Sequence, residues 1–275
     1  MSIRWKLNRL AAMDGREIGY RVSQRLRANL ERLGVMTAAR VPPLAARQSG
    51  CAWISRLPTQ FDAGRYANAA DRILAGEFDV FALRPARLGF PPAWNRDPKT
   101  GRTAPLTFGK ALDYRDERLV GDIKYLWEPS RHAELVTVAQ AWHLTRQSRY
   151  LAACRTLIES WIEQCPYARG PHWTSSLEHA IRLINWSFAW HLLGGDASPL
   201  FTAPDGPAFR QRWLTAIFRH CHFIAGHFSR HSSANNHLFG ELTGLFVAAL
   251  TWPLWPQTRA WADGAQRELQ EQALK

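Results

Sequence analysis

The sequence lacks the short motifs by which many enzymes are recognised. It contains no G-x-S-x-G nucleophile motif, no phosphate-binding P-loop and no glycine-rich dinucleotide motif, which argues against these hydrolase, NTPase and dehydrogenase classes. The four cysteines, Cys51, Cys154, Cys165 and Cys221, lie far apart and form no C-x-x-C pair. They predict neither a zinc site nor a redox centre, so we expect free buried thiols and no cofactor.

Long apolar runs and a recognisable export signal are also absent. No stretch of about 18 apolar residues occurs, so we expect no transmembrane helix. Residues 2–32 are amphipathic and rich in arginine, whereas a secretory signal needs an apolar run. The histidines between His172 and His231 show no ligand spacing that an acidic residue completes, so no metal site is expected.

Positive charge and tryptophan are present in excess. The formal net charge is +12, and the chain contains 13 tryptophans. A basic surface attracts polyanions, which include nucleic acid, anionic lipid and acidic polysaccharide. Arginine is spread over almost every predicted helix without a basic block, so we expect no nucleic-acid partner. Surplus tryptophan is typical of sugar-binding clefts and equally of core filling, and for each ring taken singly we expect a place in the core.

Helical spacing of apolar residues predicts an all-α protein. We expect a short helix and then a longer one from Arg16, a helix at 63–74, and an irregular segment from 77 to 116 with one or two small strands. Paired antiparallel helices follow, near residues 129–145, 148–164, 175–193, 207–228, 235–250 and 257–274. Such pairs are typical of an α-solenoid or an incomplete α/α toroid, and the lack of an exact repeat favours the toroid. The predicted parts are an N-terminal region, 1–120, and a toroid portion, 121–275.

Two predicted helix starts share a composition of Trp, Glu and Arg. These residues are Trp127, Glu128 and Arg131 at the first start, and Trp173, Glu178 and Arg182 at the second. Glu128, Arg131 and His132 are spaced to share one helical face, and Glu178 and Arg182 are spaced to pair. If both starts point the same way, as hairpins require, these residues converge on one cleft that binds an acidic sugar. The alternative is that they form ordinary ion pairs within helices.

A third helix start carries Asn235, Asn236 and His237. Ser232 or Ser233 is the predicted N-cap, which places these three residues in the first helical turn. The N–H groups and dipole at this end favour an anion, to which Asn offers a neutral donor and His a switchable one. We therefore expect recognition of a carboxylate or stabilisation of developing negative charge. The alternative is that these residues only cap the helix.

Together these residues give the chain a family resemblance. It resembles the N-terminal helical domain of the heparinase II/III-like polysaccharide lyases. The matching pieces, in the family's order, are residues 13–21 (MDGREIGYR), 113–115 (DYR), 121–124 (GDIK), Trp127 with Glu128 and Arg131, Trp173 with Ser175, Ser176 and Glu178, Arg182 with Asn185 and Trp186, and Asn235, Asn236 and His237 with Glu241.

The resemblance implies an incomplete α/α toroid and β-elimination on a uronate-containing polysaccharide, such as heparin, heparan sulfate, alginate or an exopolysaccharide. It implies catalytic roles for Asn236, whose amide neutralises the uronate carboxylate as the C5 proton leaves, and for His237, which assists there or in proton transfer. Trp127, Glu128, Arg131, Trp173, Glu178, Arg182 and Asn235 are then the expected substrate-binding residues. A tyrosine on a later helix and a histidine from a C-terminal β-sandwich normally complete such a site.

The chain departs from the family pattern because it stops at Lys275, before the region expected to carry that tyrosine and the β-sandwich. Tyr114, Tyr125, Tyr150 and Tyr167 all precede the Asn-His pair, so none matches the family's base. We expect a fragment of a longer protein or a truncated homologue, which would not turn over substrate alone.

Two expectations about function therefore stay open. The chain is either the toroid domain of a lyase or a catalytically silent α/α module that binds acidic polysaccharide. Relatives of this kind act in the periplasm or cell envelope, so we expect that compartment, although no export signal is visible in the sequence.

Overall fold

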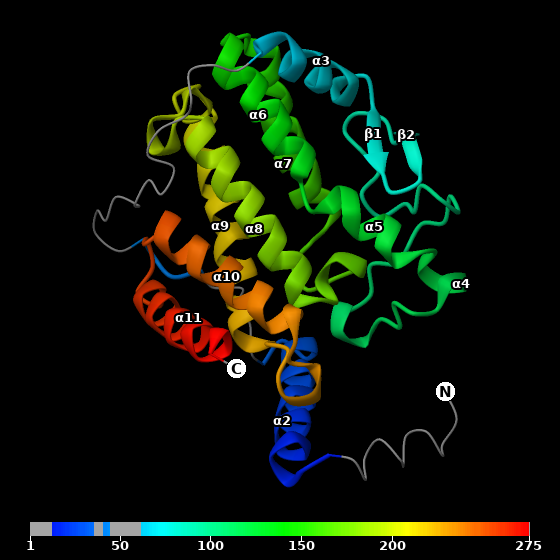
Figure 1. The fold of residues 1–275 in the computed structure, drawn as a ribbon, viewed down its shortest axis with the longest axis vertical. Helices are drawn as coiled ribbons and strands as arrows, with labels where there is room; N and C mark the ends of the chain where they lie inside the picture. Colours follow the sequence, from blue (N-terminus) through cyan, green and yellow to red (C-terminus); the bar gives the residue numbers. More distant parts are fainter. Residues whose placement is uncertain (1–12, 36–40, 45–61, 275) are drawn as a thin grey trace.

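Helices form most of the computed structural model, which describes residues 13–35, 41–44 and 62–274 (Figure 1). Within these residues the sheet structure is one antiparallel hairpin of β1 (Glu77–Val80) and β2 (Leu83–Arg87). The prediction of an all-α protein with an irregular segment near its N-terminus is confirmed. The short helix predicted before Asp14 and the thiol of Cys51 lie outside the described residues.

The helices follow the predicted order. They are α2 (Gly15–Arg32), α3 (Ala63–Leu74), α4 (Glu117–Val120), α5 (Ile123–Ser130), α6 (Ala133–Thr145), α7 (Ser148–Gln164), α8 (Ser176–Leu192), α9 (Gly206–Gly226), α10 (Asn236–Thr251) and α11 (Thr258–Ala273), with short 3-10 turns η1 (Gly109–Ala111), η2 (Pro171–Trp173), η3 (Gly195–Ala197), η4 (Pro199–Phe201) and η5 (His231–Ser233). Most bounds match the prediction within a residue or two.

The predicted helix start at Pro129 is wrong. A separate helix, α5, begins at Ile123, because the Asp122 side chain accepts a hydrogen bond from the Lys124 amide and caps it. Pro129 lies in the last turn of α5, and α6 begins only at Ala133. The intervening His132 takes a left-handed conformation (φ 63°), which turns the chain from one helix into the next.

Helices α8 and α10 pack side by side and run parallel. Gly244 of α10 lies against Ala180 near the start of α8, where an added Cβ would come within 2.5 Å of the Ala180 Cα. Seven residues further along each helix, the hydroxyls of Ser187 and Thr251 share a hydrogen bond of 2.6 Å. Both helices therefore begin at the same end of the molecule.

Helix α6 continues this parallel layer on the other side of α8. The Asn185 amide donates to the Arg131 carbonyl just before α6, and the His143 ring donates to the Leu192 carbonyl at the far ends of both helices. Helix α9 runs antiparallel to α8. The three parallel helices and their antiparallel returns, α7, α9 and α11, form the hairpins of an incomplete α/α toroid (Figure 1).

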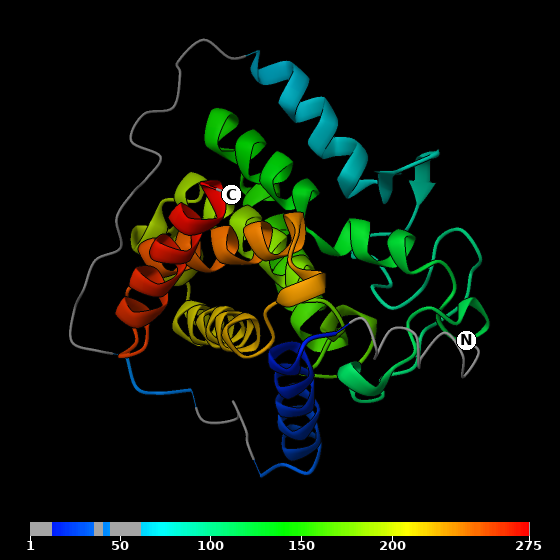
Figure 2. The ribbon, with the colours of Figure 1, turned by 60° about the horizontal axis from the view of Figure 1, so that its bottom comes forward.

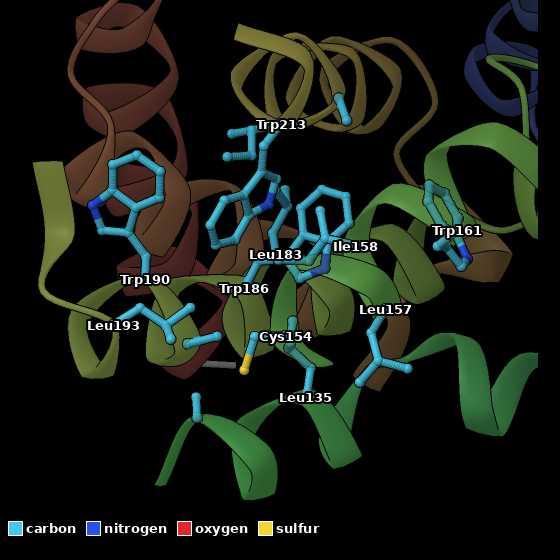
Figure 3. Close-up of a cluster of buried hydrophobic side chains, with 14 of the residues drawn as sticks. Leu135, Cys154, Leu157, Ile158, Trp161, Leu183, Trp186, Trp190, Leu193 and Trp213 are labelled. Atoms are coloured by element: carbon cyan, nitrogen blue, oxygen red, sulfur yellow. The ribbon is translucent and has the colours of Figure 1, made fainter. Parts of the chain in front are cut away.

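Tryptophan fills the space between these hairpins. Trp161 of α7, Trp186 and Trp190 of α8 and Trp213 of α9 are buried and form a chain of neighbouring rings through the main hydrophobic cluster (Figure 3). Ring centroids of Trp186 and Trp161 lie 5.9 Å apart, in an edge-to-face arrangement that aromatic pairs favour. Most of the tryptophan surplus therefore stabilises the hairpin core.

Three cysteines of the described region are free and buried, as predicted: Cys154, Cys165 and Cys221. None of the described helices is both long and apolar enough to cross a bilayer. The division at residue 120 stays a prediction. Helix α3 packs on α6 across that boundary.

Helix α2 is oriented with its polar side toward the rest of the protein. The side chains of Glu17, Tyr20, Gln24 and Glu31 all bond to the segment from His227 to Ser232. Its apolar residues face away and are exposed, at Ile18, Val22, Leu26, Leu30 and, just beyond the helix, Leu33. The views agree that α2 lies beside the chain that leads into α10 (Figures 1 and 2).

Candidate functional site

Helices α6, α8 and α10 run parallel, so their starts point the same way, as the hairpin argument predicts. Helices α8 and α10 begin at one end of the layer, whereas α6 begins beside Asn185, about halfway along α8 (Figure 1). The amide N–H groups of a first helical turn lack partners within the helix. Three parallel helices therefore direct these groups and the positive ends of their dipoles toward the same end of the molecule. This end favours a bound anion.

Asn235, Asn236 and His237 are all exposed at the start of α10. The predicted N-cap, Ser232 or Ser233, is wrong, because both residues belong to η5. Asn235 is the N-cap itself, and its Oδ1 accepts from the His237 amide at 2.8 Å. Asn236 and His237 occupy the first turn, as predicted, and their side chains are accessible to a ligand.

Arg131 links the starts of α6 and α8. Its guanidinium donates to both carboxylate oxygens of Glu178, at 2.8 and 3.0 Å, and to Glu128 at 2.6 Å. Glu178 is only 2% exposed, whereas the side chain of Arg131 is 29% exposed. The hydrogen bonds that Arg131 donates to Glu178, and the opposite charge of that carboxylate, raise the pKa of Arg131. The two sequence pieces are thus joined, and Arg131 reaches the surface.

Trp127 is partly exposed beside this ion pair. Its indole N–H donates to the Pro171 carbonyl at 3.0 Å, which fixes the ring orientation. The ring centroid of Tyr114 lies 5.6 Å away, and the Arg115 guanidinium lies over Tyr114. Tyr114 and Arg115 belong to the DYR segment that carries part of the family resemblance. They therefore add an aromatic and a basic side chain beside Trp127.

Trp173 and Arg182 do not line the surface, contrary to the predicted cleft contacts. They are 2% and 0% exposed, and Arg182 does not pair with Glu178. The guanidinium of Arg182 lies 4.1 Å from the Trp161 ring centroid and donates to the Ser130 carbonyl and to His220. Burial lowers the pKa of Arg182 to about 10, so it stays charged at neutral pH.

Four buried histidines surround Arg182, and His132 is one of them, so it does not share a helical face with Glu128 and Arg131. Burial and the nearby Arg182 charge lower their pKa values and keep the rings neutral. They are His132, His172, His179 and His220. This buried cluster holds the chain between α5 and α6. The Trp186 indole donates to His132, and the Arg182 guanidinium donates to the carbonyl of Ser130, the last residue of α5.

The chain that leads into Asn235 is held by α2. The Tyr20 hydroxyl donates to the Phe228 carbonyl at 2.5 Å, and the Ser232 hydroxyl donates to Glu17 at 2.6 Å. The His227 ring bonds to Gln24 at 2.9 Å and to Glu31 at 3.0 Å. These contacts span about 200 residues of sequence, so helical periodicity gives no sign of them.

Two acidic residues, from α10 and α11, anchor the same segment. Glu241, buried in α10, accepts from the amide and hydroxyl of Ser229 at 2.6 and 2.8 Å. Glu268 of α11 accepts both ends of the Arg230 guanidinium, at 2.5 and 2.8 Å. The segment before Asn235 is therefore fixed by three helices, which orders the position of Asn236 and His237.

No group of three or more His, Cys, Asp or Glu side chains within the described ranges is placed to hold a metal ion. The chemistry available at this end of the layer is that of amide and imidazole groups, an arginine and helix N–H donors. Such a set suits binding of an anionic ligand and stabilisation of negative charge.

The fold is an incomplete, all-α toroid of helical hairpins. The chain belongs to the Heparinase II/III N-terminus family, which matches residues 94–275. No curated protein matches the sequence closely enough to count as a relative.

Solved structures share the fold. The heparan sulfate lyase HepC from Pedobacter heparinus superposes with a TM-score of 0.59 at 16% identity, over 90% of this chain and 35% of that one. The heparinase III BT4657 gene product gives 0.61 at 17% identity, over 82% and 34%. The chain thus spans about a third of the length of these similar structures.

Proposed function

We propose that this chain is the toroid domain of a polysaccharide lyase that cleaves uronate-containing acidic polysaccharide by β-elimination. The observation that carries the proposal is the exposed Asn236–His237 pair in the first turn of α10, at the end where the parallel α8 also begins. The family membership and the heparan sulfate lyase fold support the same reaction class. A heparan sulfate-like polymer is the first substrate to test, and the periplasm or cell envelope is the proposed compartment.

The proposed chemistry starts from the carboxylate of the uronate. When the C5 proton leaves, negative charge develops on that carboxylate, and the Asn236 amide donates to it. The N–H groups and dipole of α10 add to this stabilisation, and His237 either donates there or moves a proton. Removal of one preorganised donor of this kind costs roughly 10²–10³ in kcat.

Substrate contacts follow the exposed side chains. We propose that the Trp127 ring stacks on a sugar, that Arg131 and Asn235 hold polar groups of the polymer, and that Glu128 orients Arg131. The buried Trp173, Glu178 and Arg182 are positioning residues that do not touch the polymer. They support Arg131 and the ends of α5 and α8.

A base is still needed for the C5 proton. Tyr20 is tied to the segment before Asn235, but its hydroxyl donates to a carbonyl, and burial raises its pKa. We propose that the base comes from polypeptide beyond this chain, because the chain spans only about a third of the similar structures. The engaged Tyr20 hydroxyl also favours a second candidate, a silent module that binds acidic polysaccharide.

The test uses the gene product expressed to its natural stop codon. Heparin, heparan sulfate, alginate, hyaluronan and a bacterial exopolysaccharide are each incubated with it, and the ultraviolet absorbance of unsaturated uronate is followed. Product from one polymer supports the lyase proposal and identifies the substrate class. Binding without product from any polymer favours the silent module.

A further inference from the structure

A cavity of about 350 Å³ lies between α2, the segment from His227 to Ser233 and Lys110 of η1. Four cationic side chains line it, Arg21, Arg25, Lys110 and Arg230, and none of its lining residues carries a carboxylate. A hollow with cations and no acidic lining concentrates the positive potential inside it.

Two of the four cations already have partners. Arg21 pairs with Glu17 at 2.7 Å, and Arg230 pairs with Glu268. Lys110 and Arg25 form no ion pair within the described part of the chain. The lining of the cavity is therefore positively charged, and Lys110 contributes from the interior and Arg25 from the exposed rim.

Lys110 is held in a poorly solvated position. Its ammonium donates to the Thr174 carbonyl at 3.2 Å and lies 4.9 Å from the Phe223 ring centroid. Burial lowers its pKa to about 8, a sign that water compensates its charge only weakly. The carboxylates of Glu241 and Glu31 act on Lys110 from outside the cavity lining and favour its charged form. An anion in the cavity would compensate this poorly solvated charge further.

We propose that this cavity is a second subsite, which binds a carboxylate or sulfate group of the polysaccharide beside the sugar that is cleaved. This inference rests on the lyase function proposed above. Ser233, in the cavity lining, precedes Asn235 by two residues, so the cavity adjoins the start of α10. A polymer held at Asn236 and His237 would place a neighbouring acidic group against Lys110 and Arg25.

The test measures binding, separately from turnover. Calorimetric titration at one fixed salt concentration compares heparin, which carries sulfates and carboxylates, with hyaluronan, which carries carboxylates only, and with neutral dextran. Lys110→Gln is expected to weaken heparin binding by about tenfold, as for one lost charge-assisted hydrogen bond. The matched control, Lys124→Gln, removes an exposed lysine outside the cavity and should change the affinity by less than about twofold.

A pH series tests whether Lys110 acts through its charge. Affinity should fall as pH rises through the Lys110 pKa, which lies near 8 in the free protein and higher with an anion bound. The charged groups that act on Lys110 are the carboxylates of Glu241 and Glu31, and burial lowers the pKa of the neighbouring His227. Lys110→Arg keeps a positive charge and should abolish the fall. A purely structural lysine would give no such difference.

Arg25→Gln keeps the inference testable if Lys110→Gln does not fold, because Arg25 is exposed. Equal affinity of the unmodified protein, Arg25→Gln and any folded Lys110 variant would overturn the subsite. Loss of heparin binding alone assigns the subsite to sulfate, and loss of both polymers assigns it to carboxylate. Lys110-dependent binding without unsaturated product would refute the lyase function and support the cavity as an anion site. Unsaturated product with Lys110-independent binding would support the lyase function and refute the anion site.

Discussion

Gly244 offers a direct test of the contact that aligns α8 and α10. An added Cβ would lie 2.5 Å from the Ala180 Cα and 2.7 Å from its carbonyl oxygen, which is backbone that cannot rotate away. Gly264 in α11 has nothing within 4 Å of the same position. Gly→Ala in an open helix stabilises by up to about 1 kcal/mol, whereas overpacking costs about 1–3 kcal/mol. The two substitutions should therefore have opposite signs.

Urea unfolding followed by tryptophan fluorescence measures both changes. Gly244→Ala should lower the free energy of unfolding by about 1–2 kcal/mol, and Tm by several degrees, at roughly 2–4 °C per kcal/mol. Gly264→Ala should raise both. Gly240→Ala should lie between them, because its Cβ would meet only the movable end of Leu177, at 2.6 Å. If Gly244→Ala is as stabilising as Gly264→Ala, the two helices do not approach as described.

Three further changes test separate parts of the account. Arg131→Ala leaves the carboxylate of Glu178 buried without its partner and should cost about 3 kcal/mol in urea unfolding; no change would remove this ion pair from the support of the site. Burial raises the pKa of Glu134 from 4.5 to about 7, so the folded state loses stability as pH rises between these values. Glu134→Gln should therefore be more stable than the unmodified protein by about 1–3 kcal/mol above pH 7, and equally stable below pH 4.5. Parallel pH profiles of the two proteins would contradict this. Tyr20→Phe removes the donor to Phe228 and should cost about 1 kcal/mol and speed amide exchange in the segment before Asn235, whereas unchanged exchange would show that α2 does not hold it.

Helix bounds could be read from sequence where punctuation is unambiguous. The helix at 148–164 is confirmed, and it ends where Cys165 precedes Pro166. Proline at position 129 predicts a helix start there, whereas Asp122 after Gly121 is the actual cap and starts α5 at Ile123. Cap chemistry therefore outweighed the position of proline.

Side-chain roles at the site were less predictable than the helices. Trp and Arg beside a helix start suit a sugar cleft or a core equally, and only packing separates Trp127, which is partly exposed, from the buried Trp173. Spacing predicted a Glu178–Arg182 pair, but Glu178 bonds to Arg131 and Arg182 to His220. Contacts between distant segments decided both cases.

The central claim is that Asn236 and His237 promote β-elimination. The measurement is the rate of unsaturated uronate formation by the gene product expressed to its stop codon, for the unmodified protein, Asn236→Ala, His237→Ala and the control Asn68→Ala, an exposed asparagine on α3. The account predicts a fall of roughly 10²–10³ in kcat for the two site variants and an unchanged rate for the control. Equal rates in all four proteins would contradict it.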